Sequence, residues 1–387
     1  MLPEVHSQIV FEMLLRKKAE VNKCFALSLA CPYLNARDLL ALSLTGSSVR
    51  IRLKNGSART LRMDISGLGR EKAKTVLQWY SRFFPHAKEI VAVGTREEIM
   101  FALQGAAKLP LTRLSITLQA ETWGGGESPS PDRFLDGNAL AAACGGFPLL
   151  QRIEMKNIGP FSPRAFVRSC SASGLQMIRL SKCPTLMDSC LSAMVLRALS
   201  LLELSVDECP SLICPVLKSN SLIRLKLSKC FSLQRVNVSQ CPNLVIVDFP
   251  WTVFLVETPP LWALNSLRYL SLAGAARLES FEIERLPSTV SSIDLGSCTK
   301  LKSVAIRHCP NLVYLNVAFC IKLESIVLTY IPLLEELDLS LLTKLKCVEL
   351  TEDLSLKKLL VDGCDKLRSG AIKSRRISSS ISMKKGD

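Results

Sequence analysis

The chain has 387 residues, a formal net charge of +15 and 48% hydrophobic residues. That is enough for one large solenoid or two ordinary domains, with a large buried core. No apolar run approaches the roughly 18 residues of a membrane span, which excludes that class. The sequence has no CxxC pair, and its three histidines, His6, His86 and His308, are far apart. We therefore expect no metal site and no cofactor.

The first twenty residues, "MLPEVHSQIVFEMLLRKKAE", do not show a charged region followed by a clean apolar run. A secretory signal is therefore not expected, and the glutamates argue against a transit peptide. We expect an intracellular protein, cytoplasmic or nuclear, without a membrane partner. Its 15 cysteines are then expected to be reduced rather than paired in disulfides.

Residues 1–59 are expected to form a helical N-terminal region. "MLPEVHSQIVFEML" opens with Leu-Pro and continues as an apolar helix, and "YLNARDLLALSLTGSSVRIRL" follows from Tyr33. Together they resemble the two halves of an F-box, although extra residues separate the halves and Ser48-Val49 stand where that motif usually has tryptophan. The resemblance implies that a Skp-family adaptor of a cullin ubiquitin ligase contacts Leu34, Asp38, Leu39, Leu40 and Leu42. A helical cap of a solenoid is the alternative, and the two interpretations are compatible.

Strands and helices are expected to alternate from Thr60 onward. The strands are "TLRMDISG", "KEIVAVG" and "LTRLSITL", and the helices are "REKAKTVLQWYSRFF" and "REEIMFALQGAA". This alternation favours a parallel sheet. Residues 119–137, rich in Gly, Pro and Ser, are expected to be a mobile loop insertion. Their GGG run is not followed by GxxxxGK[ST], so we do not interpret it as a phosphate-binding loop.

The second half of the chain repeats one phrase about every 11 residues. In "CPNLVYLNVAFCIKLESIVL", from Cys309, it takes the form LxxLxLxxCxxL. It resembles the leucine-rich repeat family, whose LxL segment is a short parallel strand on the concave side of a curved solenoid. A whole repeat of that kind has 20–29 residues, so two phrases must form one coil. Concave strands are expected to open at Leu150, Leu175, Leu201, Leu222, Leu244, Leu267, Val290, Leu312, Leu334 and Leu356.

The long coil from Cys183 to Val206 contains a predicted helix and resembles the cysteine-containing repeats of F-box proteins. The predicted fold is an α/β leucine-rich repeat solenoid over residues 60–368. Its back is expected to be helical in the N-terminal repeats and extended after about residue 210. One cysteine position recurs in the phrase, and we expect these thiols to be buried and to meet backbone carbonyls where the strands end. Its members are Cys183, Cys209, Cys230, Cys241, Cys298, Cys309, Cys320 and Cys364.

The middle positions of the concave strands are predicted to form one column, with neighbours roughly 4.8 Å apart. The column is Arg179, Ser205, Lys226, Asp248, Ser271, Asp294, Asn316, Asp338 and Leu360. Its acidic part, with tyrosines one register over, fits a partner with a basic segment. The candidate partner-binding residues are Asp248, Tyr269, Asp294, Tyr314, Asn316, Glu336 and Asp338. A merely solvated face is the alternative. Every second member lacks a carboxylate and the sequence shows no catalytic motif, so we do not expect an enzyme.

Residues 369–387 are basic and rich in serine, and they are expected to be a disordered tail. Within the tail, "RRIS" resembles a site for basic-directed kinases and makes Ser378 a candidate phosphorylation site. The sequence therefore favours a protein-interaction protein, with substrate recognition in a ubiquitin ligase as the specific form of that function. The alternative is an RNA-binding or ribonucleoprotein component that uses the basic surface and tail.

Overall fold

The computed structural model describes residues 60–64, 74, 87–106, 109–118, 147–158, 174–284, 287–351, 356–367, 372–374 and 382–384. The chain divides into two compact units. Unit 1 contains Met1–Ile158 and Arg168–Gly174, and unit 2 contains Gly159–Val167 and Leu175–Asp387. Residues 1–59, the insertion at 119–137 and Ser378 lie outside the described residues. Among the described helices, none has the length and apolarity to cross a membrane.

Unit 1 contains four described parallel strands and one described helix. Its strands are β1 (Thr60–Asp64), β2 (Glu89–Gly94), β3 (Arg113–Leu118) and β4 (Arg152–Lys156), which pair in that order. Helix α5 (Arg96–Ala106) follows β2. These elements confirm the predicted strands that begin at Thr60, Lys88 and Leu111, and the predicted helix at "REEIMFALQGAA". Of the other predicted helix, only Lys74 is described, and it is helical.

Helix α5 begins with a reciprocal cap. The Thr95 backbone N–H and hydroxyl donate to Glu98 Oε2 at 3.0 and 2.8 Å, and the Glu98 N–H approaches Thr95 Oγ1 at 3.5 Å. Thr-x-x-Glu is the sequence of a capping box, which satisfies backbone donors that a helix start leaves free. The cap explains why Glu98 is buried.

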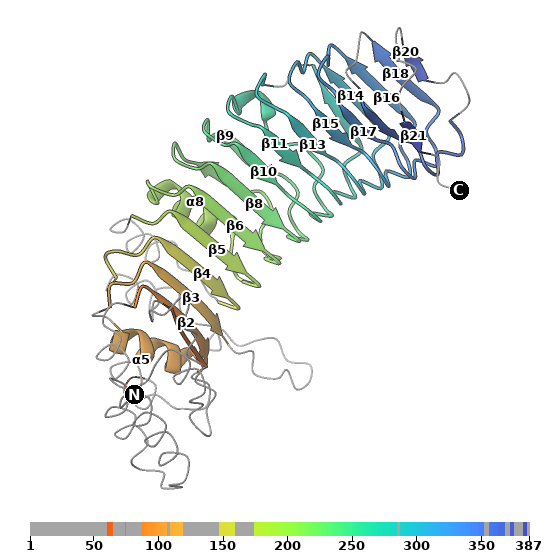
Figure 1. The fold of residues 1–387 in the computed structure, drawn as a ribbon. Coiled ribbons are helices and arrows are strands. Elements are labelled where there is room, and N and C mark those ends of the chain that lie inside the picture. The colour runs from red at the N-terminus through yellow and green to blue at the C-terminus, as the bar shows by residue number, and fades with distance from the viewer. Residues whose placement is uncertain are drawn as a thin grey trace, which may run out of the picture. The chain divides into compact units, whose positions relative to one another are not determined.

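Unit 2 carries a long parallel sheet, which we call the front sheet (Figure 1). Each strand pairs with the next one in space, with no strand reversed. From β8 to β19 the paired positions are 22 or 23 residues apart, as expected for two 11-residue phrases per coil. The strands are β5 (Met177–Ser181), β6 (Glu203–Asp207), β8 (Arg224–Ser228), β10 (Ile246–Asp248), β11 (Tyr269–Ser271), β13 (Ser292–Asp294), β15 (Tyr314–Asn316), β17 (Glu336–Asp338), β19 (Lys358–Leu360) and β21 (Ser382–Lys384).

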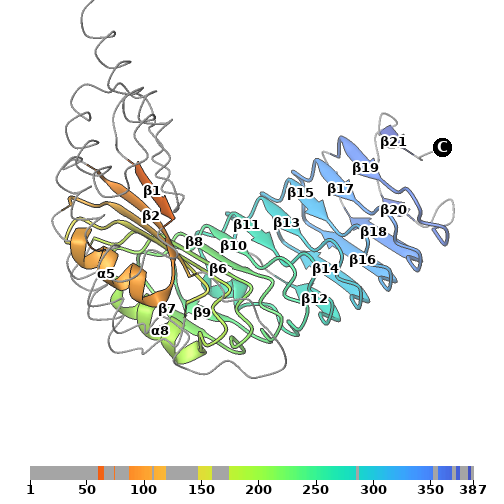
Figure 2. The same cartoon turned by 90° about the horizontal axis from the view of Figure 1, so that it is seen from below.

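The opposite side of unit 2 changes from helix to strand along the chain. Helix α8 (Asp188–Arg197) lies on the back of the first coil. In the coils that follow, the back is formed by β7 (Val216–Lys218), which pairs with β9 (Asn237–Gln240). After η3 (Leu261–Ala263), a second parallel sheet, the back sheet, runs beside the front sheet (Figure 2). Its strands are β12 (Ser280–Ile283), β14 (Ser303–Arg307), β16 (Ser325–Thr329), β18 (Cys347–Thr351) and β20 (Ile372–Ser374). The predicted switch near residue 210 is confirmed.

The core lies between the two sheets and is built from the apolar positions of both phrases. In one coil, the front phrase buries Leu312, Leu315 and Val317, and the back phrase buries Leu323, Ile326 and Leu328 completely. Burying a side chain of this size contributes roughly 1.5–3 kcal/mol. Parallel strands, coils of 21–26 residues and a leucine core together make unit 2 a solenoid of the leucine-rich repeat type.

The turn after each front strand from β5 to β19 contains a residue with a left-handed backbone. This position has φ between +50° and +63° at eight non-glycine residues and is glycine at Gly274 and Gly363. The N–H of this residue donates to a carbonyl of the next coil, as in Lys229 to Pro250 at 2.9 Å and Phe319 to Ser340 at 2.9 Å. These inter-coil bonds hold a conformation that costs a non-glycine residue about 1–2 kcal/mol. The eight are Lys182, Glu208, Lys229, Trp251, Ser297, Phe319 and Leu341 on the front strands, together with Asn157 in unit 1.

The recurring cysteine faces the core, and at every predicted position except Cys241 it comes directly after a residue with a left-handed backbone. Seven of the eight predicted cysteines are buried, whereas Cys364 is half-buried, so the expectation is wrong at that position. Their thiols donate to strand-end carbonyls, for example Cys209 to Asp207 at 3.4 Å and Cys320 to Leu295 of the preceding coil at 3.2 Å. Where Thr252 replaces cysteine, its hydroxyl donates to the Phe249 carbonyl at 2.9 Å. The predicted structural role of this position is confirmed.

Two short strands lie within the segment that we expected to be a disordered tail. β20 pairs with β18, and β21 pairs with β19, so the parallel arrangement of both sheets continues beyond residue 369. The expected domain boundary at residue 368 and the phosphorylation of Ser378 stay predictions.

Candidate functional site

The front sheet aligns the predicted column of middle positions. Arg179 pairs with Ser205, Ser205 with Lys226, and Lys226 with Asp248. The series continues through Ser271, Asp294, Asn316, Asp338 and Leu360 in the predicted order. The seven candidate partner-binding residues therefore lie together on one face of β10, β11, β13, β15 and β17.

The N-terminal part of this column offers less free charge than its sequence suggests. Lys226 Nζ lies 2.9 Å from Asp248 Oδ2 on the neighbouring strand, so the two charges compensate each other. Ser271 is only 2% exposed, although the strand pattern alone placed it toward solvent. Asp248 is therefore a weaker candidate for partner binding than the carboxylates further along.

Three candidate residues also stabilise the turns that follow their strands. Asp294 Oδ1 accepts the Gly296 N–H at 3.0 Å, Asn316 Oδ1 accepts the Ala318 N–H at 2.9 Å, and Asp338 Oδ1 accepts the Ser340 N–H at 3.0 Å. These are Asx turns, in which the side chain satisfies the N–H two residues later. Our sequence reasoning took these residues as simple surface charges and missed this role, although Asp or Asn at each strand end was a signal for it.

The same carboxylates keep acceptor capacity on the surface. Asn316 Nδ2 donates to Asp294 Oδ1 at 2.8 Å, and the Ser340 hydroxyl donates to Asp338 Oδ1 at 2.6 Å. All these bonds use Oδ1. Among the described cations, none lies within ion-pair distance of Asp294 or Asp338. The hydrogen bonds described here thus use one oxygen of each carboxylate.

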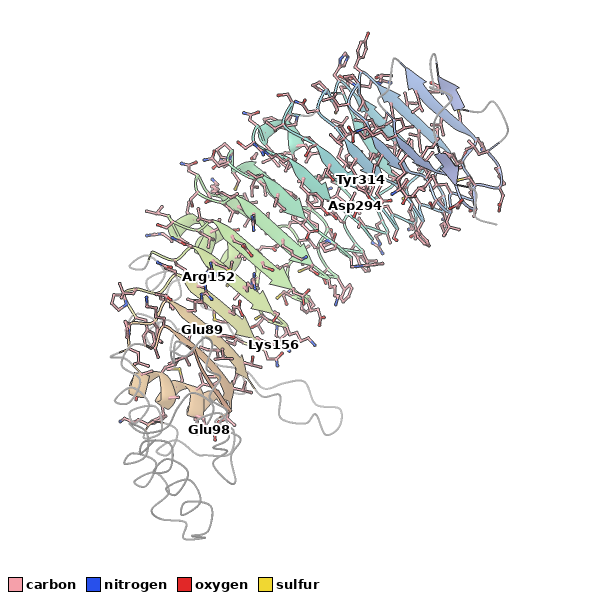
Figure 3. All side chains as sticks on the ribbon, in the orientation of Figure 1. Glu89, Glu98, Arg152, Lys156, Asp294 and Tyr314 are labelled. Atoms are coloured by element: carbon pink, nitrogen blue, oxygen red, sulfur yellow. The ribbon has the colours of Figure 1, made fainter. Side chains whose placement is uncertain are left out.

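Tyr314 lies among these carboxylates. Asp294 and Tyr314 lie close together over the neighbouring strands β13 and β15 (Figure 3), and Tyr314 pairs with Glu336 on β17. Partial burial raises the pKa of the Tyr314 phenol, and the charges of Asp294, Asp338 and Glu336 raise that pKa further. The phenol thus stays protonated as a hydrogen-bond donor. We call Tyr314, Asp294, Asp338 and Glu336 the acidic cluster.

Tyr269 borders the acidic cluster on the N-terminal side. Tyr269 lies on β11 and pairs with Ser292 on β13, which in turn pairs with Tyr314 on β15. The two tyrosines therefore occupy the same register and are separated by one strand. Burial raises the pKa of the Tyr269 phenol, and the carboxylates of Asp248 and Asp294 add to the effect. The predicted placement of both tyrosines beside the acidic column is confirmed.

The acidic cluster has the chemistry of a cation-binding surface. Its carboxylates only accept hydrogen bonds, and the phenols supply amphipathic contact area. Lys358 Nζ lies 3.6 Å from Glu336 Oε2, but both side chains are about half exposed, so this ion pair contributes little. Within the described residues, no group of three or more His, Cys, Asp or Glu side chains could hold a metal ion.

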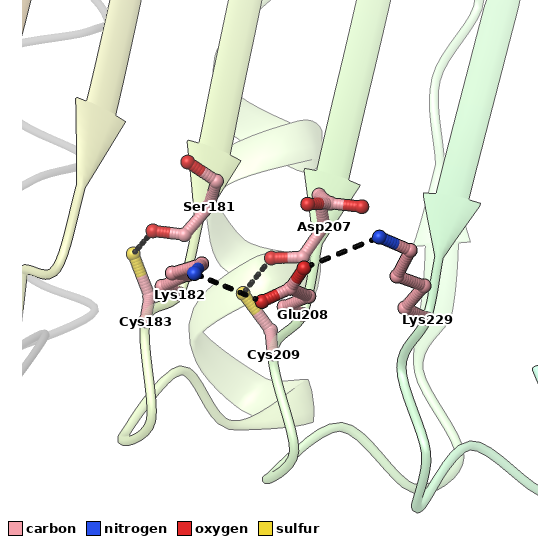
Figure 4. A network of polar contacts seen from close by, with 7 residues as sticks. All are labelled: Ser181, Lys182, Cys183, Asp207, Glu208, Cys209 and Lys229. Carbon is pink, nitrogen blue, oxygen red and sulfur yellow. Dashed lines mark hydrogen bonds and ion pairs between the residues drawn. The ribbon is translucent and has the colours of Figure 1, made fainter.

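At the turn edge beside β5, β6 and β8, two lysines share one carboxylate. Glu208 forms an ion pair with each of two lysines: Oε2 lies 3.3 Å from Lys182 Nζ, and Oε1 lies 3.3 Å from Lys229 Nζ (Figure 4). Burial acts to raise the pKa of Glu208, but the hydrogen bonds from Lys229 and Lys182 outweigh it, so the pKa is lowered. One carboxylate thus bridges two lysines across three coils.

No family model matches the sequence, and no curated protein matches it. Among solved structures, a leucine-rich repeat protein from Bacteroides ovatus has 15% identity over 62% of this chain and 76% of that chain, with a TM-score of 0.28. The Rad7 and Elc1 complex in yeast has 12% identity over 98% and 92%, with a TM-score of 0.28. The leucine-rich repeat domain of APL1B has 14% identity over 72% and 85%, with a TM-score of 0.25. The leucine-rich repeat type of the fold rests on the coil length, strand register and core of unit 2 itself.

Proposed function

We propose that this chain is a non-enzymatic protein-interaction protein whose front sheet binds a basic segment of a partner protein at the acidic cluster. The observation that carries the proposal is the convergence of Asp294, Asp338 and Glu336 on Tyr314 across three adjacent strands. A rigid sheet holds these groups in place, so little conformational entropy is lost on binding.

The free oxygens of Asp294 and Asp338 are the proposed acceptors for lysine or arginine side chains. Hydrogen bonds between ionised groups are stronger than neutral ones and are often short. Tyr314 and Tyr269 would supply the contact area around these bonds, as tyrosines do at many protein interfaces. Surface charges of one sign also accelerate the approach of a partner of the other sign, which makes binding sensitive to salt.

Replacing Asp294 and Asp338 together by asparagine tests the acidic cluster. Asparagine keeps the Oδ1 acceptor of both Asx turns and removes only the charge, so the thermal midpoint should stay close to that of the parent. Loss of two charge-assisted contacts should weaken binding of a fluorescein-labelled deca-lysine peptide by about tenfold or more. Fluorescence anisotropy measures this, and the difference should shrink at high salt because screening is stronger.

The matched control removes two carboxylates from the back sheet. Glu282 lies on β12 and Glu349 on β18, so Glu282→Gln with Glu349→Gln changes the net charge by the same amount. This control should bind the peptide like the parent. If both double variants weaken binding equally, the effect is one of total charge, and the acidic cluster is only a solvated surface.

We propose further that residues 1–59 tether the protein to a Skp-family cullin adaptor, which would make the chain a substrate-recognition subunit of a ubiquitin ligase acting inside the cell. Support comes from the F-box resemblance at Leu34, Asp38, Leu39, Leu40 and Leu42. In a pull-down with a purified Skp-family adaptor, the full chain should bind, and the Leu39→Asp, Leu40→Asp double variant should not. Absence of adaptor binding by the folded parent chain would leave the N-terminal region as a solenoid cap.

A further inference from the structure

A second charged surface lies at the turn edge that leads from the front sheet to the back sheet. The residue just before the opening leucine of the back phrase is basic in five successive coils. Inter-coil backbone bonds such as Lys302 N–H to Glu279 O at 2.8 Å and Lys346 N–H to Glu324 O at 2.9 Å align the adjacent positions. The cations are therefore about one strand spacing, roughly 4.8 Å, apart. We call Arg277, Lys300, Lys322, Lys344 and Lys366 the basic ladder.

The basic ladder is exposed, and its members form no close ion pairs with carboxylates of the described residues. All five side chains are exposed, and no carboxylate of the described residues lies within ion-pair distance of any of them. The residues that lie two positions after the ladder members alternate in charge along the coils and form ion pairs. Lys302 pairs with Glu279 at 2.7 Å, and Lys346 pairs with Glu324 at 2.6 Å. The paired column is neutral, so the ladder leaves a line of positive charge on this edge.

Aromatic side chains accompany the ladder. Trp251 and Phe319 occupy the left-handed position of their turns and are each 52% exposed. The Trp251 ring lies against Gly274, where an added Cβ would come within 2.6 Å of a ring carbon. The Arg277 guanidinium lies 4.0 Å from the centre of the exposed Phe254 ring. Fixed aromatic faces thus lie along the same turns as the cations.

We propose that this turn edge binds single-stranded nucleic acid, with the basic ladder on the phosphates and the aromatic side chains on the bases. Proteins that bind single strands combine a track of positive charge with aromatic side chains on which unpaired bases stack. A duplex would offer only its phosphates, because its bases are already stacked. The lysines near the other end of unit 2 do not form such a free line of charge, because Lys182 and Lys229 share the Glu208 carboxylate. This site is separate from the acidic cluster and does not depend on it.

The test uses the full chain and a fluorescein-labelled oligouridylate of about twenty nucleotides, enough to span the ladder at strand spacing. If all five cations contact phosphates, log Kd should change with log salt with a slope of about 3.5, from about 0.7 per cation. Lys300→Gln with Lys344→Gln should lower the slope by about 1.4 and weaken binding at about 50 mM salt by tenfold or more. Phe319→Ala should weaken binding about fivefold or more without changing the slope, because stacking carries no counterion release.

Lys302→Gln with Lys346→Gln is the matched control, since it removes the same charge from the paired column of the same edge. It should retain the parent slope, and every variant should retain deca-lysine binding, which reports on the acidic cluster and not on this edge. Equal loss in the control and ladder variants would overturn the proposal in favour of non-specific attraction. Binding of a deca-glutamate peptide in preference to the oligonucleotide, with the same dependence on Lys300 and Lys344, would overturn it in favour of an acidic peptide site. Tighter binding of a duplex than of the single strand would contradict the assigned role of the aromatic side chains.

Discussion

Replacing Cys320 by aspartate is expected to lower the stability of unit 2 by about 3–5 kcal/mol or more, because it buries a charge without a partner. Cys320 is fully buried, and its thiol donates to the Leu295 carbonyl at 3.2 Å. An aspartate carboxylate in that position would face the carbonyl oxygen with another acceptor. Natural domains are stable by only about 5–15 kcal/mol, so a large part of the total would be lost. Thermal unfolding followed by circular dichroism measures the effect.

Cys320→Ser is the control, because a hydroxyl is smaller but can donate to the same carbonyl. Its midpoint should lie far closer to the parent than that of Cys320→Asp. Cys364→Asp should cost less, since Cys364 is half-buried. In the folded parent chain, thiol reagents should label Cys320 slowly. Rapid labelling, or an aspartate variant as stable as the serine variant, would show that this position is not enclosed.

Replacing Gly274 by alanine is expected to destabilise the same unit by about 2–4 kcal/mol, from two separate causes. Its φ of +78° is in the left-handed region, which costs an L-residue about 1–2 kcal/mol. The new Cβ would also lie 2.6 Å from the nearest Trp251 ring carbon, and overpacking of this kind costs about 1–3 kcal/mol. Chemical denaturation with the midpoint and slope fitted separately measures the change.

A double-mutant cycle separates the two causes. Trp251→Ala removes the ring, so Gly274→Ala in that background should cost only the backbone part. The interaction energy of the cycle should then be about 1 kcal/mol or more. Gly174→Ala, in unit 1, shows the effect of the same replacement where no heavy atom lies within 4 Å of the added Cβ and φ is not positive. Full additivity of Gly274→Ala and Trp251→Ala would contradict the packing described here.

The fold could be predicted because its information is local and periodic. Eleven-residue phrases such as the one from Leu312 to Leu323 fix which side chains face the core, and 22 residues per coil fix which strands pair. The change of the back from α8 to extended strands was also readable, because the coils shorten where the helix ends. The strands β20 and β21 were missed, since their basic, serine-rich sequence resembles disordered segments.

The candidate site was predicted in position but not in its chemistry. The register placed Asp294 and Asp338 in one column with Asn316, and the structure confirms it. Their turn bonds and the Lys226–Asp248 ion pair depend on side-chain conformations that a repeat pattern does not specify. The basic ladder was present in the sequence as Arg277-Leu278 followed by four Lys-Leu pairs, at steps of 22 or 23 residues. Its residues lie between the predicted strands, outside the column whose alignment the strand register predicts.

Photo-cross-linking of a deca-lysine peptide with a diazirine group to the full chain tests the central claim most directly, because mass spectrometry then identifies the contacted residues. The account predicts cross-links concentrated on β11, β13, β15 and β17, around Tyr314, and lost in the Asp294→Asn, Asp338→Asn double variant. Cross-links centred on β12, β14, β16 and β18, or an unchanged pattern in the double variant, would contradict a binding site on the front sheet.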